Sequence, residues 1–287
     1  MAMDIGCGKG NLNPRNILEL LKYKIQFNIE HPDYFDADGL LCFVGGQGSG
    51  KTLSAVNYVY KLMEKYPNSI LCTNLMLTDY PVVTFEEYLR KPRMDKWIES
   101  VRRYAEDVGE SEEWVKAILY DEYLKSNRVF PFMDNDDLTR YGNDERGCIF
   151  FIDEIQLYMN SLESKNINMD TMTQISQQRK QRKHIVCTSQ VFGRMAKPLR
   201  EQFSSVIACK CILKTLQYNS LIDRDDLDND TSSDTNVTGV CKQRFIWFHN
   251  PKMYKRYDTY YVIEKGKFVS NDDKKGDIYG TELSNNS

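Results

Sequence analysis

Short apolar runs alternate with amphipathic segments along much of the chain, a pattern typical of a sheet with helices between its strands. The runs that we predict to be buried strands are residues 40–44, 69–74, 148–152, 185–190 and 206–213. Between the first two runs, apolar residues recur at helical spacing: Leu53, Val56, Tyr60 and Met63. The pattern therefore predicts an α/β fold with a central, mostly parallel sheet flanked by helices.

The predicted core spans residues 39–215, and residues 90–147 are expected to be an insertion of helices and loops within it. Thr84 and Ser111 are predicted helix caps, because each stands just before a segment with helical periodicity. The insertion also holds an acidic cluster that we interpret as a solvated turn rather than a metal site: Asp134, Asp136 and Asp137.

Residues 1–38 are predicted to be an N-terminal extension with one amphipathic helix that starts at Asn13-Pro14. The apolar stripe of this helix is expected to pack on the core or on a neighbouring subunit: Ile17, Leu18, Leu20, Leu21 and Ile25. Residues 191–203 are predicted to form a helix that Pro198 interrupts.

Residues 216–287 are expected to form a small C-terminal β addition with a disordered tail. Within it, residues 221–239 are rich in aspartate and lack apolar periodicity, which predicts a flexible acidic loop. Residues 244–248 and 260–263 are the predicted closing strands, and the tail begins near Ser270.

A glycine-rich loop directly follows the first predicted strand and matches the Walker A pattern of P-loop NTPases in full: Gly45, Gly46, Gln47, Gly48, Ser49, Gly50, Lys51 and Thr52. Glycines allow successive backbone N–H groups to point at phosphates, and the helix that follows adds its free N–H donors. We expect these residues and the adjacent Leu53 to bind ATP, with Lys51 at the β- and γ-phosphates. The alternative is a glycine-rich turn with a chance lysine.

The third predicted strand ends in Asp153 and Glu154, which is the Walker B arrangement. Asp153 would lie at the carboxyl end of a buried strand, where it can hold Mg²⁺ together with the Thr52 hydroxyl. Glu154 is the candidate general base for water, and Gln190 at the end of the next strand is a candidate sensor of the γ-phosphate. The alternatives are an acidic turn and an ordinary polar strand end.

The composition is that of a globular protein, with 41% hydrophobic and 28% charged residues and a formal net charge of −3. A contact with nucleic acid would therefore need a local basic patch. The eight cysteines lack zinc spacing, which favours reduced thiols. The sequence has no apolar run long enough for an integral membrane segment and no secretory signal, so we expect a cytoplasmic protein.

Over about residues 39–264, these motifs together resemble the zonula occludens toxin-like ATPases of phages and mobile elements, which are similar to the HerA–FtsK class of DNA-pumping motors. The resemblance rests on the Walker motifs, on Thr73-Asn74 at the end of the second strand, on an Arg-Lys-His run before the strand ending in Gln190, and on Tyr257-Asp258-Thr259-Tyr260. Members from filamentous phages carry a membrane span after the ATPase domain, and this sequence shows no such span.

The resemblance implies a homo-oligomeric ring in which an arginine of one subunit completes the neighbour's site. Arg179 is the first candidate, followed by Arg182, Arg194 and Arg200. In another reading, Lys180, Lys183 and Lys197 line a central channel that grips DNA phosphates. A third reading makes this basic cluster a solvated helix face.

The expected function is an ATP-hydrolysing motor of a phage or mobile element that drives DNA packaging, translocation, or virion assembly and export in the host bacterial cytoplasm. The expected partners are double- or single-stranded DNA and capsid, portal or coat proteins. One alternative is a nucleoside or small-molecule kinase, which uses the same loop. Another is a nucleotide-bound assembly scaffold without turnover.

Overall fold

The computed structural model describes residues 14–31, 34–37, 39–142, 146–161, 169–227 and 239–258. The chain divides into two compact units, Met1–Tyr34 and Phe35–Ser287. The first unit contains α1 (Pro14–Glu30), which lies in the segment predicted to be helical, while Asn13 lies outside the described residues. The stripe residues of α1 are exposed, from Ile17 at 49% to Leu20 at 61%. The packing of this helix on another surface stays a prediction.

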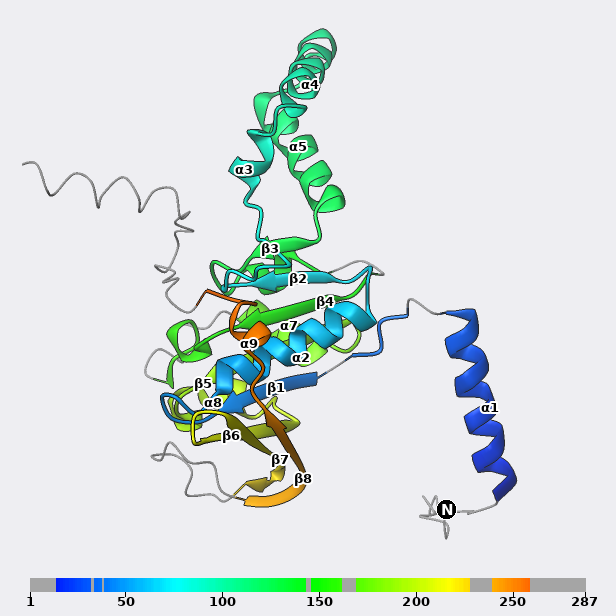
Figure 1. Ribbon diagram of the computed structural model, residues 1–287. Coiled ribbons are helices and arrows are strands. Elements are labelled where there is room, and N and C mark those ends of the chain that lie inside the picture. Colours follow the sequence, from blue (N-terminus) through cyan, green and yellow to red (C-terminus); the bar gives the residue numbers. More distant parts are fainter. Residues whose placement is uncertain are drawn as a thin grey trace, which may run out of the picture. The chain divides into compact units, whose positions relative to one another are not determined.

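The second unit is built on one sheet, which has eight strands in the order β3-β2-β4-β5-β1-β6-β7-β8 among the described residues (Figure 1). The strands from β3 to β6 pair in parallel, and β6, β7 and β8 pair antiparallel. The strands are β1 (Gly39–Val44), β2 (Ile70–Thr73), β3 (Val129–Pro131), β4 (Cys148–Ile152), β5 (Lys183–Ser189), β6 (Ser205–Ile212), β7 (Leu216–Leu227) and β8 (Gly239–Phe248). The predicted mostly parallel sheet is therefore confirmed.

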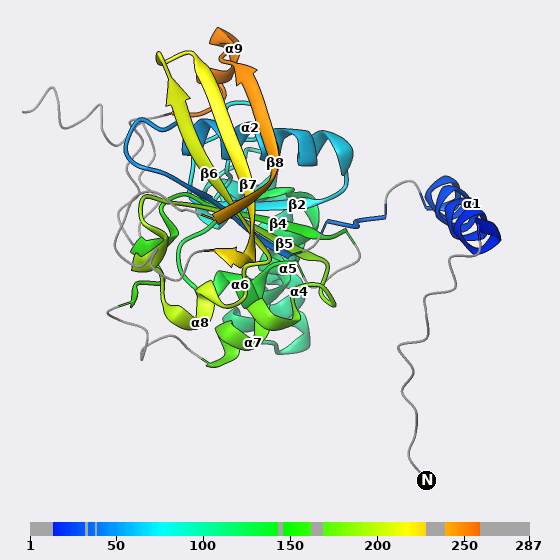
Figure 2. The same ribbon diagram turned by 90° about the horizontal axis from the view of Figure 1, so that it is seen from below.

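Helices lie on both faces of the sheet, with α2 on one face and α7 and α8 on the other (Figure 2). The helices are α2 (Lys51–Lys65), α3 (Phe85–Leu89), α4 (Met94–Val108), α5 (Glu112–Ser126), α6 (Asp137–Arg140), α7 (Met169–Gln177), α8 (Lys197–Arg200) and α9 (Pro251–Tyr254). Among the described residues, the 3₁₀ helix Ile155–Leu157 follows β4 and the 3₁₀ helix Phe192–Arg194 follows β5.

The strands β2, β4 and β5 are buried along their whole length because both of their faces are covered. Successive residues of β4 point to opposite faces, so Phe150 joins the core cluster that contains Ile175 of α7, whereas Phe151 joins the cluster that contains Val59 of α2. All five residues of β4 are buried. This two-sided core fixes the carboxyl end of β4 beside the loop that follows β1.

Helices α3, α4 and α5 extend away from the sheet beyond β3 (Figure 1). Both predicted caps are present: Thr84 forms a capping box with Glu87, and the Ser111 side chain accepts a hydrogen bond from the backbone N–H of Trp114. The prediction that residues 90–147 consist of helices and loops misses the strand at Val129–Pro131, which pairs in parallel with β2. Three apolar residues are too short a run to be recognised as a strand from the sequence.

The acidic cluster after β3 is only partly a solvated turn. Asp134 and Asp136 are exposed, but Asp137 is completely buried. Its carboxylate accepts hydrogen bonds from the backbone N–H groups of Met133 (2.7 Å) and Asp134 (3.2 Å) and pairs with Arg140 at 2.6 Å. These contacts offset part of the cost of burying the carboxylate, although burial still raises its pKa. Through them Asp137 holds the turn together.

The prediction of a flexible loop over residues 221–239 is wrong at both ends, because β7 continues to Leu227 and β8 begins at Gly239. The part of β7 that falls in the predicted loop is rich in aspartate, and every position of β8 is intermediate or exposed, so neither strand has the buried apolar run of the central strands. The middle of the predicted loop, the predicted strand 260–263 and the tail lie outside the described residues.

The predicted helix over residues 191–203 is also wrong. The structure has a 3₁₀ turn at Phe192–Arg194 and the single turn of α8 instead. Backbone contacts explain the difference: Met195 pairs with Asn160 in an isolated bridge, and the Ala196 N–H donates to the Met159 carbonyl at 3.0 Å. The chain is therefore tied to the segment after β4.

Candidate functional site

The predicted phosphate loop connects β1 to α2 at the carboxyl edge of the parallel strands. Two of its glycines are required by the structure. A Cβ atom at Gly45 would lie 2.7 Å from the Cys209 carbonyl oxygen, and one at Gly50 would collide with Gln217 Oε1. Gly50 also has φ +78° and is the N-cap residue of α2, so the loop turns directly into the helix N-terminus. The free N–H groups of such a terminus favour an anion.

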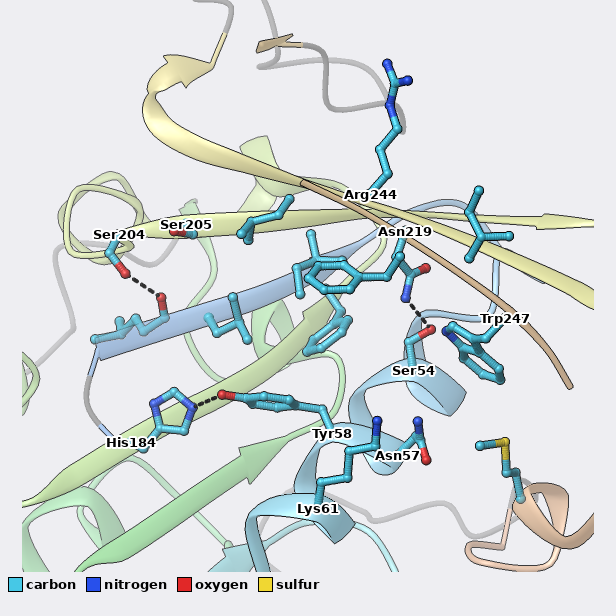
Figure 3. Close-up of a pocket in the computed structure, with 18 of the residues that line it drawn as sticks. Ser54, Asn57, Tyr58, Lys61, His184, Ser204, Ser205, Asn219, Arg244 and Trp247 are labelled. Carbon is cyan, nitrogen blue, oxygen red and sulfur yellow. Dashed lines mark hydrogen bonds between the residues drawn. The ribbon is translucent and has the colours of Figure 1, made fainter. Parts of the chain in front are cut away.

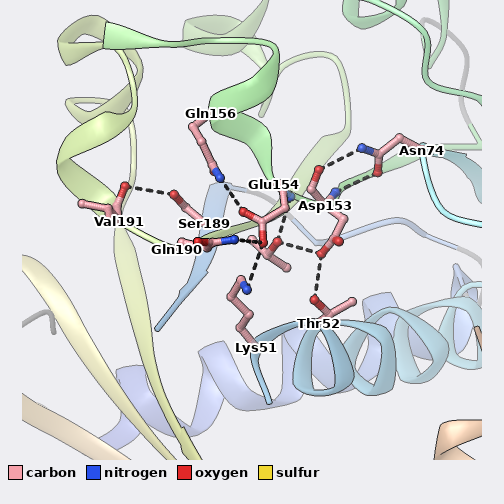
Figure 4. Close-up of polar contacts among 10 residues, drawn as sticks. Lys51, Thr52, Asn74, Asp153, Glu154, Gln156, Ser189, Gln190 and Val191 are labelled. Carbon is pink, nitrogen blue, oxygen red and sulfur yellow. Dashed lines mark hydrogen bonds and ion pairs between the residues drawn. The ribbon is translucent and has the colours of Figure 1, made fainter. Parts of the chain in front are cut away.

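Asp153 lies opposite this terminus (Figure 4). Its Oδ1 accepts hydrogen bonds from the hydroxyls of Thr52 (3.0 Å) and Thr188 (2.7 Å). Burial raises the pKa of the Asp153 carboxyl above its usual value, so the negative charge is disfavoured there without a cation. A carboxylate and a hydroxyl on one edge are oxygen ligands that fit Mg²⁺.

Glu154 has the left-handed backbone conformation, φ 53° and ψ 54°, which is uncommon for a residue with a side chain. Its N–H donates to Thr188 Oγ1 at 2.9 Å, which holds the turn. The carboxylate of Glu154 pairs with Lys51 at 2.9 Å and accepts a hydrogen bond from Gln190 Nε2 at 3.3 Å (Figure 4). Gln156 is a further donor to it. The structure therefore brings Lys51, Glu154 and Gln190 together.

Asn74, the residue after β2, fixes the backbone of Asp153 from the other side. Its amide Nδ2 donates to the Asp153 carbonyl and its Oδ1 accepts from the Asp153 N–H, both at 2.8 Å. Two hydrogen bonds between one side chain and the backbone of one residue leave little freedom for Asp153.

Gln217 of β7 supports the phosphate loop from the antiparallel side of the sheet. Its side chain is completely buried, and its Nε2 donates to the Ser49 carbonyl (2.9 Å) and to Asn219 Oδ1 (2.7 Å). Asn219 in turn donates to the Ser54 hydroxyl in α2 at 3.0 Å. His249, just after β8, contacts Gln217 Oε1 through its Nε2 at 3.1 Å. A chain of polar groups thus connects β7 and β8 to the loop.

The predicted arginines lie on different edges of the sheet. Arg179 and Arg182 precede β5, so they lie at the opposite end of that strand from Gln190, and the structure does not bring them to the site of their own chain. Arg194 follows β5 on the edge of the phosphate loop. Arg200 lies in α8.

The prediction that Lys183 lines a channel is wrong. Its side chain is 1% exposed, and its ammonium group donates to the Leu138 carbonyl (2.7 Å) and to Gln174 Oε1 (3.2 Å). Lys180 and Lys197 are exposed.

Among the described residues, α2 borders a small cavity and a large one. One, of about 330 Å³, is lined by Gly48, by residues 50–53 and by side chains from β6 and from the segment after β8. The larger, of about 860 Å³, lies between α2 and strands β1, β6, β7 and β8, and is lined by neither Lys51 nor Thr52 (Figure 3). Hydrogen bonds from Tyr58 to His184 (3.1 Å) and from Asn219 to Ser54 lie along this larger cavity.

Sequence reasoning gave no role to Thr188 or Gln217, and it singled out Asn74 only as part of the resemblance, without its contact to Asp153. Thr188 had a usable signal, since it lies near the carboxyl end of a predicted strand, as Asn74 does. Gln217 had no such signal, because the strand that carries it was not predicted.

Among the described residues, no group of three or more acidic, His or Cys side chains is placed to hold a metal, and no helix has the length and apolar character needed to cross a membrane.

The central strand order, the loop after β1 and the acidic end of β4 define the fold as that of a P-loop NTPase. No protein-family model matches the sequence, and no curated protein matches it. Solved structures are similar at low identity. The N-terminal domain of zonular occludens toxin from Neisseria meningitidis is 13% identical, with 77% of this chain and 100% of that chain covered and a TM-score of 0.43.

Two further similar structures come from other sources. The genome packaging NTPase B204 from Sulfolobus turreted icosahedral virus 2, in complex with ATP-gammaS, is 11% identical, with 75% of this chain and 98% of that chain covered and a TM-score of 0.41. The flagellar accessory protein FlaH from Methanocaldococcus jannaschii is 12% identical, with 79% of this chain and 89% of that chain covered and a TM-score of 0.37. All of these TM-scores are below 0.5, so the fold assignment is based on the topology of this chain.

Proposed function

We propose that this chain is an ATP-hydrolysing motor of a phage or mobile element. One observation carries the enzymatic part of the proposal: Thr52 and Asp153, which are 101 positions apart in the sequence, are joined by a 3.0 Å hydrogen bond at the start of the α2 helix. Lys51 and Glu154 form a second contact at the same place. Two strand ends and a glycine loop thus supply the groups that phosphoryl transfer requires.

Lys51 changes partner in this mechanism. Its ammonium group is paired with Glu154, and the two side chains are only 9% and 20% exposed. A triphosphate on the loop offers Lys51 several negative oxygens, and the lysine then leaves the carboxylate. Backbone N–H groups of residues 45–52 bind the β- and γ-phosphates beside it. Nucleotide binding therefore releases Glu154 for the chemical step.

Thr52 and Asp153 are the ligands that this chain would offer to Mg²⁺. When bound, Mg²⁺ neutralises the charge that develops on the phosphoryl oxygens. A cation there would also lower the cost of ionising the buried Asp153 carboxyl, whose pKa is raised by burial. Asn74 and Thr188 keep this carboxyl in place.

Glu154 then orients a water molecule and accepts its proton. The water oxygen forms a bond to the γ-phosphorus while the bond from that phosphorus to the bridging oxygen breaks, which gives ADP and inorganic phosphate. Gln190, 3.3 Å from the Glu154 carboxylate, is positioned to hold the same water or a γ-phosphate oxygen. The left-handed backbone of Glu154 aims its side chain at this point.

The motor part of the proposal rests on the resemblance to zonula occludens toxin-like ATPases. We propose a homo-oligomeric ring that acts on double- or single-stranded DNA in packaging, translocation or virion assembly, with capsid, portal or coat proteins as further partners. Arg194 is the arginine that we place first for completing a neighbour's site, because it follows β5 on the edge of the phosphate loop. Arg179 stays a candidate through a different subunit contact.

The test is phosphate release from ATP by the wild type and by Glu154→Gln, with ATP binding measured on the same samples. Loss of the general base should lower turnover by about 10²–10⁴-fold while Mg²⁺-dependent ATP binding is retained. Lys51→Ala is the matched control that should lose binding itself. Unchanged turnover in Glu154→Gln would overturn the assignment of the base.

The same assay with no DNA, single-stranded DNA or double-stranded DNA tests the motor. Stimulation by DNA, together with a nucleotide-dependent rise in mass, supports a ring that moves DNA. Ring formation without turnover would support the scaffold instead. Turnover that needs a small-molecule acceptor would indicate a kinase.

A further inference from the structure

The smaller cavity continues directly from the phosphate loop into a region that the Walker motifs do not define. This cavity has a volume of about 330 Å³, and residues 50–53 at the start of α2 form one of its sides. On the other side lie Cys211 near the end of β6, Lys214 in the β6–β7 turn, and three rings from the segment after β8: His249, Tyr254 and Tyr257. Three rings beside a phosphate site are the surface that a flat heteroaromatic group packs on.

The segment that carries these rings is fixed to the core. The Thr78 N–H donates to the Arg256 carbonyl at 2.9 Å, and Tyr257 pairs with Leu77 in an antiparallel bridge. From α2, the Tyr60 hydroxyl donates to the same Arg256 carbonyl at 3.0 Å. The Arg256 guanidinium also lies over the Tyr60 ring, 4.4 Å from its centroid. Contacts within the protein therefore hold the rings beside the loop.

The polar atoms of two of the rings are already engaged within the protein. Gln217 Oε1 can only accept, so His249 Nε2 carries the proton and donates to it at 3.1 Å. The other nitrogen, His249 Nδ1, then accepts from the Tyr254 hydroxyl. Burial lowers the pKa of His249, which agrees with a neutral ring. The two rings also contact each other in a T-shaped arrangement, with centroids 5.6 Å apart, and Trp247 lies against His249 at 5.2 Å. Their polar edges are therefore engaged, and a ligand would pack on the ring surface that these contacts leave uncovered.

We propose that this cavity binds the base and ribose of the nucleoside triphosphate whose phosphates lie on residues 45–52, and that it does so mainly by packing against the rings of Tyr254, His249 and Tyr257. This inference rests on the proposed function and names the part of the substrate that the Walker motifs leave undefined. Because every base has an aromatic face, packing of this kind discriminates weakly between bases. ATP and GTP should then bind with affinities within about tenfold of each other.

The experiment compares two ligands that share the triphosphate and differ in the nucleoside: ATP and inorganic tripolyphosphate. The wild type should bind ATP at least about tenfold more tightly, because the packed rings contact only the nucleoside. Tyr254→Ala should lower the affinity for ATP by about tenfold and leave that for tripolyphosphate unchanged. Tyr254→Phe keeps the ring and should stay within about threefold of the wild type.

The matched control is Tyr104→Ala, since Tyr104 is 58% exposed on α4, while Tyr254 is 49% exposed on α9. Neither substitution removes a buried side chain, so both variants should fold. Equal affinities of the wild type for ATP and tripolyphosphate would overturn the nucleoside site but leave the phosphate site intact. Failure to bind either ligand would instead overturn the proposed function.

Discussion

The two halves of the sheet differ in burial and in what they give to the site. In the parallel half, β2, β4 and β5 are buried at every position. In the antiparallel half, every position of β8 is intermediate or exposed, and Phe248 is 75% exposed. The parallel half supplies the groups proposed to act on the phosphates, and the antiparallel half supplies Gln217 and leads into His249 beside them.

This division shows how a site can combine fixed and adjustable parts. The reacting groups stand at the ends of strands whose side chains are packed on both faces, so their positions follow from the core. The groups in the second half support the phosphate loop and, by our inference, contact the nucleoside. They come from strands that are partly exposed to solvent and from the segment after those strands. Sequence changes in the second half would therefore alter ligand preference or loop position without disturbing the core.

The largest difference between the halves should be in stability. Phe150→Ala removes a completely buried ring from the centre of β4, and we expect a loss of about 3–5 kcal/mol in the free energy of unfolding. The equivalent change in β8, Phe248→Ala, removes a ring that is mostly in solvent and should cost no more than about 0.5 kcal/mol.

Urea or thermal unfolding of the two variants measures this contrast. Equal losses would mean that Phe248 is covered in the assembled protein, in which case the exposed face of β8 is an interface. A small loss for Phe150→Ala would contradict the two-sided core itself.

The second prediction concerns the contact between the halves. Gln217→Ala removes the donor to the Ser49 carbonyl and the acceptor of His249, and should cost about 1–3 kcal/mol in stability because buried partners lose their hydrogen bonds. The phosphate loop also loses its support, so the affinities for ATP and for inorganic tripolyphosphate should fall together. Isothermal titration with both ligands distinguishes this loss from a nucleoside effect.

The control for this variant is Gln243→Ala, an exposed glutamine on β8, which should change stability by no more than about 0.5 kcal/mol. If Gln217→Ala unfolds more easily yet binds both ligands as the wild type does, Gln217 has a structural role only.

The difference in burial between the two halves also explains which strands could be predicted from the sequence. The strands β1, β2, β4, β5 and β6 were predicted because burial on both faces demands continuous apolar runs, and the Walker motifs located Lys51 and Asp153 at the same edge. The strand β7 was missed because much of its segment looks like an acidic loop. Its strand conformation comes from pairing with β6 and β8, which periodicity over a short window does not reveal.

The site shows the same limit at the level of single residues. Glu154 was singled out from its place after Asp153, but its left-handed backbone and its pairing with Lys51 depend on Thr188 and on the loop geometry. Asp137 was taken for a solvated acid because the sequence does not show the N–H groups that compensate its burial. Long-range contacts, and not local patterns, decide these cases.

The smallest expected effect compares one ion pair from each half. Lys242 on the edge strand β8 pairs with Asp223 of β7, and the two side chains are 54% and 30% exposed. Lys242→Ala should change the free energy of unfolding by no more than about 1 kcal/mol. An exposed ion pair adds little stability, because water solvates the two charges almost as well when they are apart. The difference should shrink further at about 1 M salt, where the screening length is about 3 Å. Thermal unfolding at low and high salt measures this difference in stability.

The pair Lys51–Glu154, whose side chains are 9% and 20% exposed, should respond less to salt. If Lys242→Ala costs clearly more than this, β8 depends on its charges for pairing, and the antiparallel half is less independent of its surface than its exposure indicates.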